Sequence, residues 1–363
     1  MRVVHYYRDI HRPSGVTHAI GEWQQAVAQM GVETIVLHAG PGEPESWPGT
    51  TEAIPHFGFG RQTQVPQLGP ALKPGDVLVL HEGWVSSNLV AARACRAKGI
   101  PYVVVPHGVY DPSILVDLKF PRGIRFALER QSLRGAAAAH VFYRSEQALV
   151  EAVGRPKSFL VAPTGYDPSD RRWVGGGGYV GWFGRYSMHH KGIDLLLRAY
   201  AQMDRDNRLP LRLHGPDYQG GKAQVQRLVK ELALEDCVSV GAPLSGCEKW
   251  DFLVEADALV YPSRWESHSI ALLEGLSIGA PAVVSSSVHV ATQLSSSGAA
   301  KVVDMGDPDE VARGIQFATG NSALGSLGRK VAMRDFAWGK AARDFVEHAR
   351  RLSSSELPDG RDG

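Results

Sequence analysis

Cysteine is almost missing from this chain. Only three cysteines occur in 363 residues, Cys95, Cys237 and Cys247, and their spacing matches no metal-ligand pattern. An odd, widely spaced set argues against the disulfide framework on which small secreted proteins depend. We therefore expect a reduced, intracellular protein.

The chain also lacks an excess of charge of either sign. Its 39 lysines and arginines against 38 aspartates and glutamates leave a formal net charge of +1. Nucleic-acid-binding domains usually carry a clear basic surplus, so we expect no nucleic-acid partner.

Long apolar stretches are missing as well. No run approaches the ~18 residues that a membrane-spanning helix needs. The residues from Met1 to Arg8 read as a first strand rather than as the apolar centre of a signal peptide. The predicted location is the cytoplasm.

Glycine and proline, by contrast, are plentiful, with 40 and 22 copies. They predict many tight turns and positions where the backbone comes close to a ligand. Hydrophobic residues make up 44% and charged residues 21% of the chain, as in ordinary globular proteins. The length allows about two domains of ~150 residues each.

Short apolar strands alternate with amphipathic helices along nearly the whole chain. Strands at 3–7 and 34–38 enclose a helix at 16–30. Four glycines at 175–178 then interrupt the pattern, and the alternation restarts with a strand at 179–183. The two halves are therefore built alike.

This alternation predicts an α/β fold with two Rossmann-like, doubly wound parallel-sheet domains. We expect the domains at 1–170 and 171–334, with a last helix at about 335–352. Two such domains predict a central cleft. Ligands of open α/β sheets bind beyond the carboxyl ends of the strands, so the loops at those ends are where we expect the chemistry.

Two glutamates follow a buried strand at 258–260. Glu266 falls in the strand-to-helix loop, and Glu274 lies inside the next helix, ~12 Å further along if the residues between are helical. At the start of that helix the amides of Ser269, Ile270 and Ala271 would face an anion such as a diphosphate. Taken alone, the pair is more often solvated surface, with a serine as N-cap.

A second loop carries two cations. The strand at 179–183 ends before Gly184, and Arg185 and Lys191 then lead into a helix that starts near Ile193. A leaving diphosphate needs such groups, because arginine clamps it with two hydrogen bonds and lysine supplies a point charge. The competing interpretation is that both side chains are solvated.

Together these two segments resemble the retaining glycosyltransferases of the GT-B type, specifically glycosyltransferase family 4 (group 1). Further markers follow in matching order along almost the whole chain. They include Ser14-Gly15-Val16, Pro106-His107-Gly108, Thr164-Gly165-Tyr166-Asp167, Leu213-His214-Gly215, Gly279-Ala280-Pro281 and Phe336-Ala337-Trp338. The resemblance implies that the last helix crosses back to an N-terminal acceptor domain and that the C-terminal domain binds the donor.

The resemblance also implies residue roles. Arg185 and Lys191 would stabilise the donor diphosphate as it leaves, and Glu274 would accept hydrogen bonds from the donor ribose. Glu266 would contact hydroxyls of the transferred sugar, and His107 would lie beside the sugar ring. The remaining donor-site positions are backbone contacts: Gly15, Gly184, Ser267, His268, Ser269, Ile270 and Ala271.

This chain departs from the family pattern at two places. Where the family commonly has Gly-Phe-Gly after the first glutamate, it has Ser267-His268-Ser269, whose Cβ atoms narrow the approach and bear on donor choice. Where the family has asparagine, it has Thr164. We interpret His189 and His190 as variable loop residues rather than metal or phosphate ligands.

Acceptor-side residues are harder to read. Asp9, His11 and Arg12 lie on the first loop and His81 at a strand end, where each could touch the acceptor, and for His81 a structural role is as good an interpretation. The expected acceptor is a glycan, a lipid-linked molecule or a small molecule.

A basic stretch contains Lys119, Phe120, Arg122, Arg125, Phe126, Arg130 and Arg134. We favour a solvated helix face there. The alternative is a weak peripheral contact with an anionic membrane, which would place the protein at the inner face of the membrane.

The resemblance implies sugar transfer from a nucleoside-diphosphate sugar such as a UDP- or GDP-sugar, with retention and without a metal or other cofactor. A sugar-nucleotide 2-epimerase of similar fold and a non-catalytic nucleotide-sugar-binding relative are the alternatives. A dehydrogenase is poorly supported, because no Gly-x-Gly-x-x-Gly opens the first helix.

Overall fold

The computed structural model of the protein describes residues 1–12, 14–42, 44, 46–58, 60–112, 122–167 and 169–354, with residues 122 and 207 described by backbone only. The chain divides into two compact units. Unit 1 comprises Met1–Gly165 and the segment from Trp338 onward, and unit 2 comprises Tyr166–Ala337.

Unit 1 contains a seven-stranded parallel sheet in the order β3-β2-β1-β4-β5-β6-β7. Its strands are β1 (Arg2–Tyr7), β2 (Glu33–His38), β3 (Thr51–Ala53), β4 (Asp76–His81), β5 (Tyr102–Val105), β6 (Ala138–Val141) and β7 (Phe159–Val161). The direction in which strands are added reverses between β1 and β4. Such a switch point is where open α/β sheets bind ligands.

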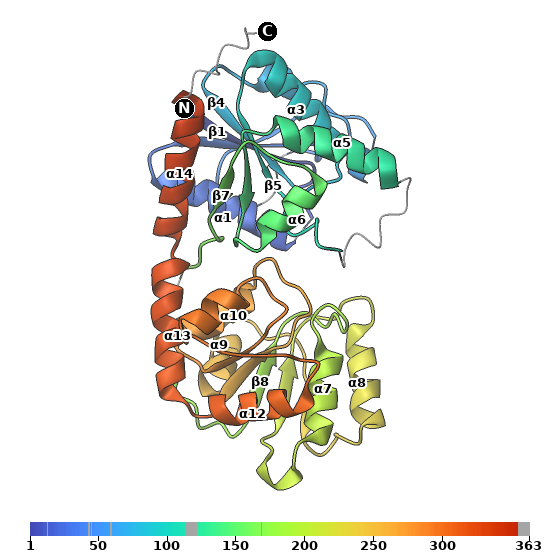
Figure 1. Ribbon diagram of the computed structural model, residues 1–363, viewed down its shortest axis with the longest axis vertical. Helices are drawn as coiled ribbons and strands as arrows, with labels where there is room; N and C mark the ends of the chain where they lie inside the picture. The colour runs from blue at the N-terminus through green and yellow to red at the C-terminus, as the bar shows by residue number, and fades with distance from the viewer. Residues whose placement is uncertain are drawn as a thin grey trace. The chain divides into compact units, whose positions relative to one another are not determined.

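Helices cover both faces of this sheet (Figure 1). They are α1 (Gly15–Gln29), α2 (Leu68–Ala71), α3 (Ser86–Lys98), α5 (Arg122–Gly135), α6 (Glu146–Val153) and α14 (Trp338–Ser354), with a short 3-10 helix at Gly60–Gln62. Because side chains alternate along a strand, Val4 and Tyr6 of β1 join the core under α3 and α5. His5 points the other way and stacks on Phe345 of α14, which packs beside α1.

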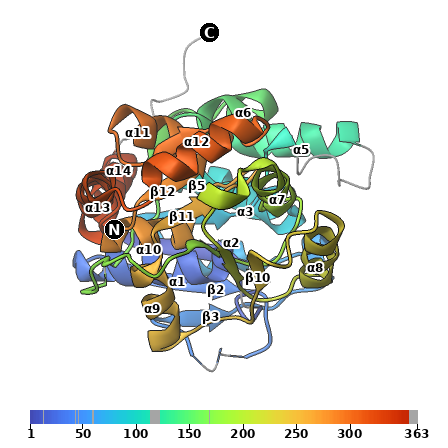
Figure 2. The ribbon, with the colours of Figure 1, turned by 90° about the horizontal axis from the view of Figure 1, so that it is seen from below.

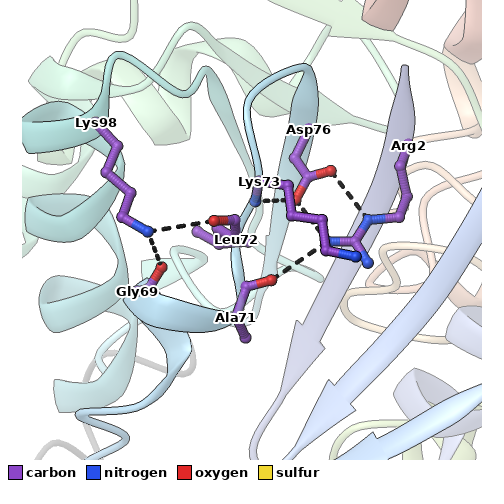
Figure 3. A network of polar contacts seen from close by, with 7 residues as sticks. All are labelled: Arg2, Gly69, Ala71, Leu72, Lys73, Asp76 and Lys98. Carbon is purple, nitrogen blue, oxygen red and sulfur yellow. Dashed lines mark hydrogen bonds and ion pairs between the residues drawn. The ribbon is translucent and has the colours of Figure 1, made fainter.

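The amino-terminal edge of the unit 1 sheet is held by a polar network (Figure 3). The guanidinium of Arg2 donates two hydrogen bonds to Asp76, at 3.0 and 2.7 Å, and so ties the start of β1 to the start of β4. Asp76 also accepts from the Lys73 amide at 2.8 Å, and Lys98 donates to the carbonyls of Gly69 in α2 and of its C-cap Leu72. This edge therefore stabilises the sheet, whereas the opposite edge carries the histidines described below.

Unit 2 contains a six-stranded parallel sheet in the order β10-β9-β8-β11-β12-β13. Its strands are β8 (Val180–Phe183), β9 (Leu211–His214), β10 (Val238–Val240), β11 (Ala258–Tyr261), β12 (Ala282–Ser285) and β13 (Lys301–Val303). Its helices are α7 (Ile193–Gln202), α8 (Gly221–Glu231), α9 (Gly246–Glu255), α10 (Ile270–Ile278), α11 (Ala291–Ser296), α12 (Pro308–Ala318) and α13 (Ser322–Asp335), with a 3-10 helix at Arg205–Asn207. Figure 2 shows α12 beside α7 on one face of the sheet. The switch point lies between β8 and β11.

The two doubly wound parallel sheets confirm the predicted fold class, but the predicted last helix at 335–352 is wrong at its start. The structure has two helices there, α13 ending at Asp335 and α14 starting at Trp338. Phe336 is fully buried, and its carbonyl accepts a 2.7 Å hydrogen bond from the Tyr166 amide, so the backbone leaves the helix at this point.

Helices α12 and α13 were not anticipated from the sequence. Asp307 caps α12 by accepting from the amides of Asp309 and Glu310, and a proline follows it, which is a readable start signal.

In the described part of the chain, no helix combines the length and the apolar character that crossing a membrane requires.

Candidate active site

Two loops meet at the switch point of unit 2, one after β8 and one after β11. The Arg264 amide donates to the His190 carbonyl at 3.0 Å. Gly192 sits in the left-handed region, with φ +63°, and a Cβ there would collide with the Pro262 carbonyl oxygen. This close backbone approach requires glycine at position 192, and it brings the two predicted motifs side by side.

The contact places Lys191 directly on Glu266. Lys191 Nζ lies 2.6 Å from Glu266 Oε2, and the side chains are 17% and 13% exposed. The Ser263 hydroxyl donates to the same oxygen at 3.1 Å. The sequence analysis predicted separate ligand contacts for Lys191 and Glu266. The structure instead joins the two side chains in one partly buried ion pair, which can present a positive and a negative group to a polar ligand.

A second ion pair in these loops was missed by sequence reasoning. Arg264 donates to both carboxylate oxygens of Asp194, at 2.7 and 2.6 Å, and so ties the β11 loop to the first turn of α7. Bidentate arginine–carboxylate pairs are geometrically specific. This pair therefore holds the loop that carries Glu266.

The two loop histidines pack on Trp265. His190 stacks on its ring, at 4.7 Å between centroids, and the His190 Nε2 lies 3.0 Å from the Trp265 carbonyl. Burial is the main cause that lowers the pKa of His190. His190 is therefore a packing residue, and among the described residues no group of three or more potential ligands could hold a metal.

Arg185 is exposed and lies over the ring of Tyr218, with its Cζ 4.3 Å from the ring centroid. The sequence analysis paired Arg185 with Lys191 as neighbouring cations. The structure instead brings Lys191 to Glu266 and Arg185 to Tyr218, in the loop after β9. Tyr218 had no sequence signal.

Glu274 is buried, 8% exposed, inside α10. Its Oε1 lies 2.7 Å from Nζ of Lys249, which comes from α9 and also lies over the ring of Trp250. Lys249 is therefore the ion-pair partner of Glu274, and the sequence analysis missed it because nothing in the local pattern of α9 marks it.

The start of α10 is open to an anion. Ser269 is the N-cap in an extended conformation, and its side chain makes no capping hydrogen bond within the described chain. The first-turn amides beginning at Ile270 and Ala271 thus lack a side-chain cap, which favours a negative ligand. Ser267 and His268 lie just before them, and burial lowers the pKa of His268 to about 4, so its ring is neutral near pH 7.

Gly15 opens α1, but this helix start differs from that of α10. Ser14 caps α1 by accepting from the Thr17 amide at 3.1 Å, and the Thr17 hydroxyl accepts from the Ser14 amide at 2.8 Å. These reciprocal bonds use two backbone donors. The start of α1 therefore has fewer free donors for a phosphate than the start of α10.

Three histidines of unit 1 form a hydrogen-bonded chain at the switch point. His5 Nδ1 lies 2.9 Å from His81 Nε2, and His81 Nδ1 lies 2.8 Å from His107 Nε2. Burial lowers the pKa of His5 and of His107 to about 3, and it holds that of His81 well below its usual range. The structure thus brings together His81 and His107, which the sequence analysis considered separately, and adds His5.

The turn after β4 is strained and braced. Glu82 and Trp84 have positive φ values, 68° and 62°. Asn88 donates to the carbonyls of His81 and Glu82, and the buried Glu129 accepts from the Trp84 amide. A positive φ costs energy for a residue other than glycine, and residues with such backbone strain cluster at functional sites. The bracing fixes the backbone that carries His81.

The first loop of unit 1 borders a pocket of about 870 Å³. It is lined by Ile10, His11, Ser14, Thr17, His18, Gly21, Glu22, Gln25, Pro44, Ser46, Trp47 and Pro48. His11 is therefore at the pocket, whereas Asp9 accepts from the His11 amide at 3.1 Å and the carbonyl of Arg12 accepts from the Thr17 hydroxyl. Asp9 and Arg12 thus shape this loop.

The predicted basic stretch falls partly outside the described residues, which exclude Lys119, Phe120 and the side chain of Arg122. On α5, Ile124 is 64% and Leu128 40% exposed. This helix thus presents large apolar side chains to solvent.

Two models of known families match this chain. The model described as glycosyl transferases group 1 matches residues 175–327, and the model of the glycosyl transferase 4-like domain matches residues 3–165. The former range contains both loops at the unit 2 switch point, and the latter contains the histidine chain.

Two relatives illustrate the similarity. The GDP-mannose:cellobiosyl-diphosphopolyprenol alpha-mannosyltransferase of Xanthomonas oryzae pv. oryzae is 24% identical over 336 residues, which are 87% of this chain and 87% of that protein. The D-inositol 3-phosphate glycosyltransferase 1 of Catenulispora acidiphila is 25% identical over 316 residues, 79% of this chain and 74% of that protein.

Solved structures share the fold. Anabaena Alr3699/HepE in complex with UDP has a TM-score of 0.76 at 16% identity, over 97% of this chain and 100% of that one. Sucrose-phosphate synthase from Thermosynechococcus elongatus has a TM-score of 0.73 at 18% identity, over 97% of this chain and 99% of that one. The likeness concerns the fold alone, and it confirms the predicted GT-B class.

Proposed function

Because the chain belongs to the group 1 glycosyltransferases of family 4, we propose that it transfers a sugar from a nucleoside-diphosphate sugar to an acceptor hydroxyl, with retention of the anomeric configuration. The observation that carries the proposal is the Lys191–Glu266 pair at the unit 2 switch point, in the segment that the group 1 family model matches.

In this proposal the donor lies in unit 2. Lys191 and Arg185 neutralise the charge that develops on the departing diphosphate, and the uncapped start of α10 adds backbone dipoles. Glu274 accepts from the ribose hydroxyls, and Glu266 contacts hydroxyls of the sugar. The protein supplies these charges itself, so we propose a reaction that requires no metal or other cofactor.

Retention needs no enzymic nucleophile in this proposal. Attack by the acceptor from the face that the diphosphate leaves would keep the configuration, and the departing diphosphate would take the acceptor proton. The positive charge on the sugar ring and the negative charge on the diphosphate both develop in the transition state, which the Lys191–Glu266 pair complements.

For the donor base we propose guanine or uracil. The Xanthomonas relative is named for GDP-mannose, and the Anabaena structure is a complex with UDP. The test is a thermal-shift panel of UDP-, GDP-, ADP- and TDP-sugars, with and without magnesium. A ligand that binds the native state raises Tm by linkage, so one sugar nucleotide should stabilise the protein selectively and equally without metal.

The same donor then separates transfer from the alternatives. A transferase consumes it only when an acceptor is supplied, whereas a 2-epimerase converts it without one, and a non-catalytic relative binds it unchanged. Epimerisation without acceptor, or stabilisation by no donor at all, would contradict the proposal.

We propose that the pocket of about 870 Å³ in unit 1 receives the acceptor. Trp47 offers an aromatic surface there, held by a 2.6 Å hydrogen bond from its Nε1 to Gln24. Trp47→Ala should raise the acceptor KM about two- to tenfold, because an aromatic contact contributes roughly 0.5–1.5 kcal/mol. Trp47→Phe should recover most of the loss. An unchanged acceptor KM in Trp47→Ala would exclude this pocket.

We further propose a weak contact of α5 with anionic membranes. Ile124 and Leu128 are large apolar side chains that α5 exposes. The double variant Ile124→Ser, Leu128→Ser should lose co-sedimentation with phosphatidylserine vesicles, whereas Phe317→Ser, Leu327→Ser on unit 2 should not. If the wild-type protein sedimented equally with neutral and anionic vesicles, the negative charge of the membrane would not contribute to the contact.

A further inference from the structure

The histidine chain of unit 1 has a direction that its hydrogen bonds define. Each neutral imidazole carries one N–H and one lone pair, and His81 uses both of its nitrogens, one toward His5 and one toward His107. Only two proton arrangements satisfy both contacts. Either all three rings carry the proton on Nδ1, or all three carry it on Nε2.

The buried end of the chain distinguishes the two arrangements. His5 Nε2 is buried and has no hydrogen-bond partner in the described part of the protein, and its ring stacks on Phe345. A proton on this nitrogen would be an orphaned buried N–H donor, which folded proteins rarely contain, whereas an unpaired lone pair is better tolerated. The proton of His5 therefore belongs on Nδ1, where it is donated to His81.

The proton positions of the other rings follow from this one. His81 accepts at Nε2 and donates from Nδ1, so His107 accepts at Nε2 and keeps its own proton on Nδ1. Stacking fixes the ring planes, at 5.2 Å between the centroids of His5 and His81 and 5.1 Å between those of His81 and His107.

We propose that His5 and His81 are positioning residues that hold His107 as the neutral Nδ1–H tautomer, so that His107 acts as a hydrogen-bond donor and not as a base. The assignment of a substrate oxygen as its acceptor rests on the proposed function; the tautomer does not. His107 is partly exposed, and its Nδ1 has no partner within the described chain, so this N–H is available to a ligand.

Burial of the rings supports neutrality. It lowers the pKa of all three rings, and His140, which faces them from β6, lowers each pKa further. Protonation of His81 or His107 would set two N–H groups against each other at one of the short contacts, and protonation of His5 would place a buried donor on its partnerless Nε2. Near pH 7 the chain is thus uncharged and its direction is retained.

The tautomer is read directly by NMR on the full chain labelled with [15N]histidine, without any substrate. In long-range 1H–15N spectra at pH 7 the His107 signals, identified by their loss in His107→Gln, should show a protonated Nδ1 and a bare Nε2. His5 and His81 should show the same pattern. A protonated Nε2 on His107, or a doubly protonated ring in the chain, would overturn the proposal.

A variant then tests whether the positioning matters. His81→Phe keeps a ring in the stack and removes both hydrogen bonds, so the His107 spectrum should show mixed tautomers. Outer partners that orient a metal-bound histidine contribute about 10- to 100-fold to activity. We expect the loss of the partner of His107 to lower kcat by a similar factor, with donor Kd unchanged. His140→Gln keeps a donor to the Ala162 carbonyl. This variant should leave the His107 tautomer unchanged and should change kcat by no more than about twofold.

The possible outcomes separate the two claims. The predicted tautomer with an unchanged kcat in His81→Phe would overturn the positioning role while leaving sugar transfer intact. If none of the donors bound, the proposed function would be overturned. The NMR spectrum of the wild-type protein would still decide the proton arrangement.

Discussion

Lys191→Ala should lower kcat by about 10²–10³-fold, with a loss of only a few degrees in Tm. Removing one preorganised group that stabilises transition-state charge typically has an effect of this size. The lysine is 17% exposed and its partner Glu266 13%, so the loss in Tm comes mainly from the partly buried carboxylate that is left without its cation. The measurement is single-turnover transfer at saturating donor, beside thermal unfolding.

Its control removes the partner of Lys191. The double variant Lys191→Ala, Glu266→Gln has no uncompensated carboxylate, so it should regain the lost Tm without regaining kcat. Lys340→Ala, which breaks the exposed 2.7 Å pair with Asp344, should behave as wild type. If kcat instead recovered together with Tm, the role of Lys191 would be structural.

Glu274→Ala should raise the donor Kd by about 10- to 100-fold. Hydrogen bonds to a charged group contribute roughly 1.5–3 kcal/mol, and each 1.4 kcal/mol is a factor of ten. The carboxylate is 8% exposed and accepts from Lys249 at 2.7 Å in the free protein. Isothermal titration with the donor found in the thermal-shift panel measures the change.

Lys249→Met is the matched control for this site. It removes the cation and retains the carboxylate, so donor affinity should stay within about threefold of wild type. Weakening of the same size in both variants would mean that the ion pair holds α9 on α10 and that Glu274 does not touch the ribose.

Local patterns predicted much of this fold. Apolar β-branched runs such as 3–7 and 258–260 became parallel strands, because a strand covered on both faces is apolar throughout. The same reasoning failed near 335–338. There a buried Phe336 and a hydrogen bond to the distant Tyr166 override local helical periodicity.

The donor-site motifs were recognisable for the same local reason. The loop that contains Gly192 and the loop around Glu266 are both short connections from a strand to a helix. The residue types in each loop are enough to indicate its chemistry. His5 carried none, since a histidine inside an apolar strand looks like any buried residue. Lys249 carried none either, since a lysine in an amphipathic helix usually faces solvent.

The order of residues was sufficient to indicate two doubly wound sheets, the family and the loops at their strand ends, because those properties depend on periodicity and on neighbours in the chain. Folding in three dimensions decided which charges and rings meet. Lys191 contacts Glu266 across 75 positions, Glu274 contacts Lys249 across 25, and His81 lies 76 positions from His5 and 26 from His107. Such pairs depend on strand order at a switch point, which no local pattern encodes.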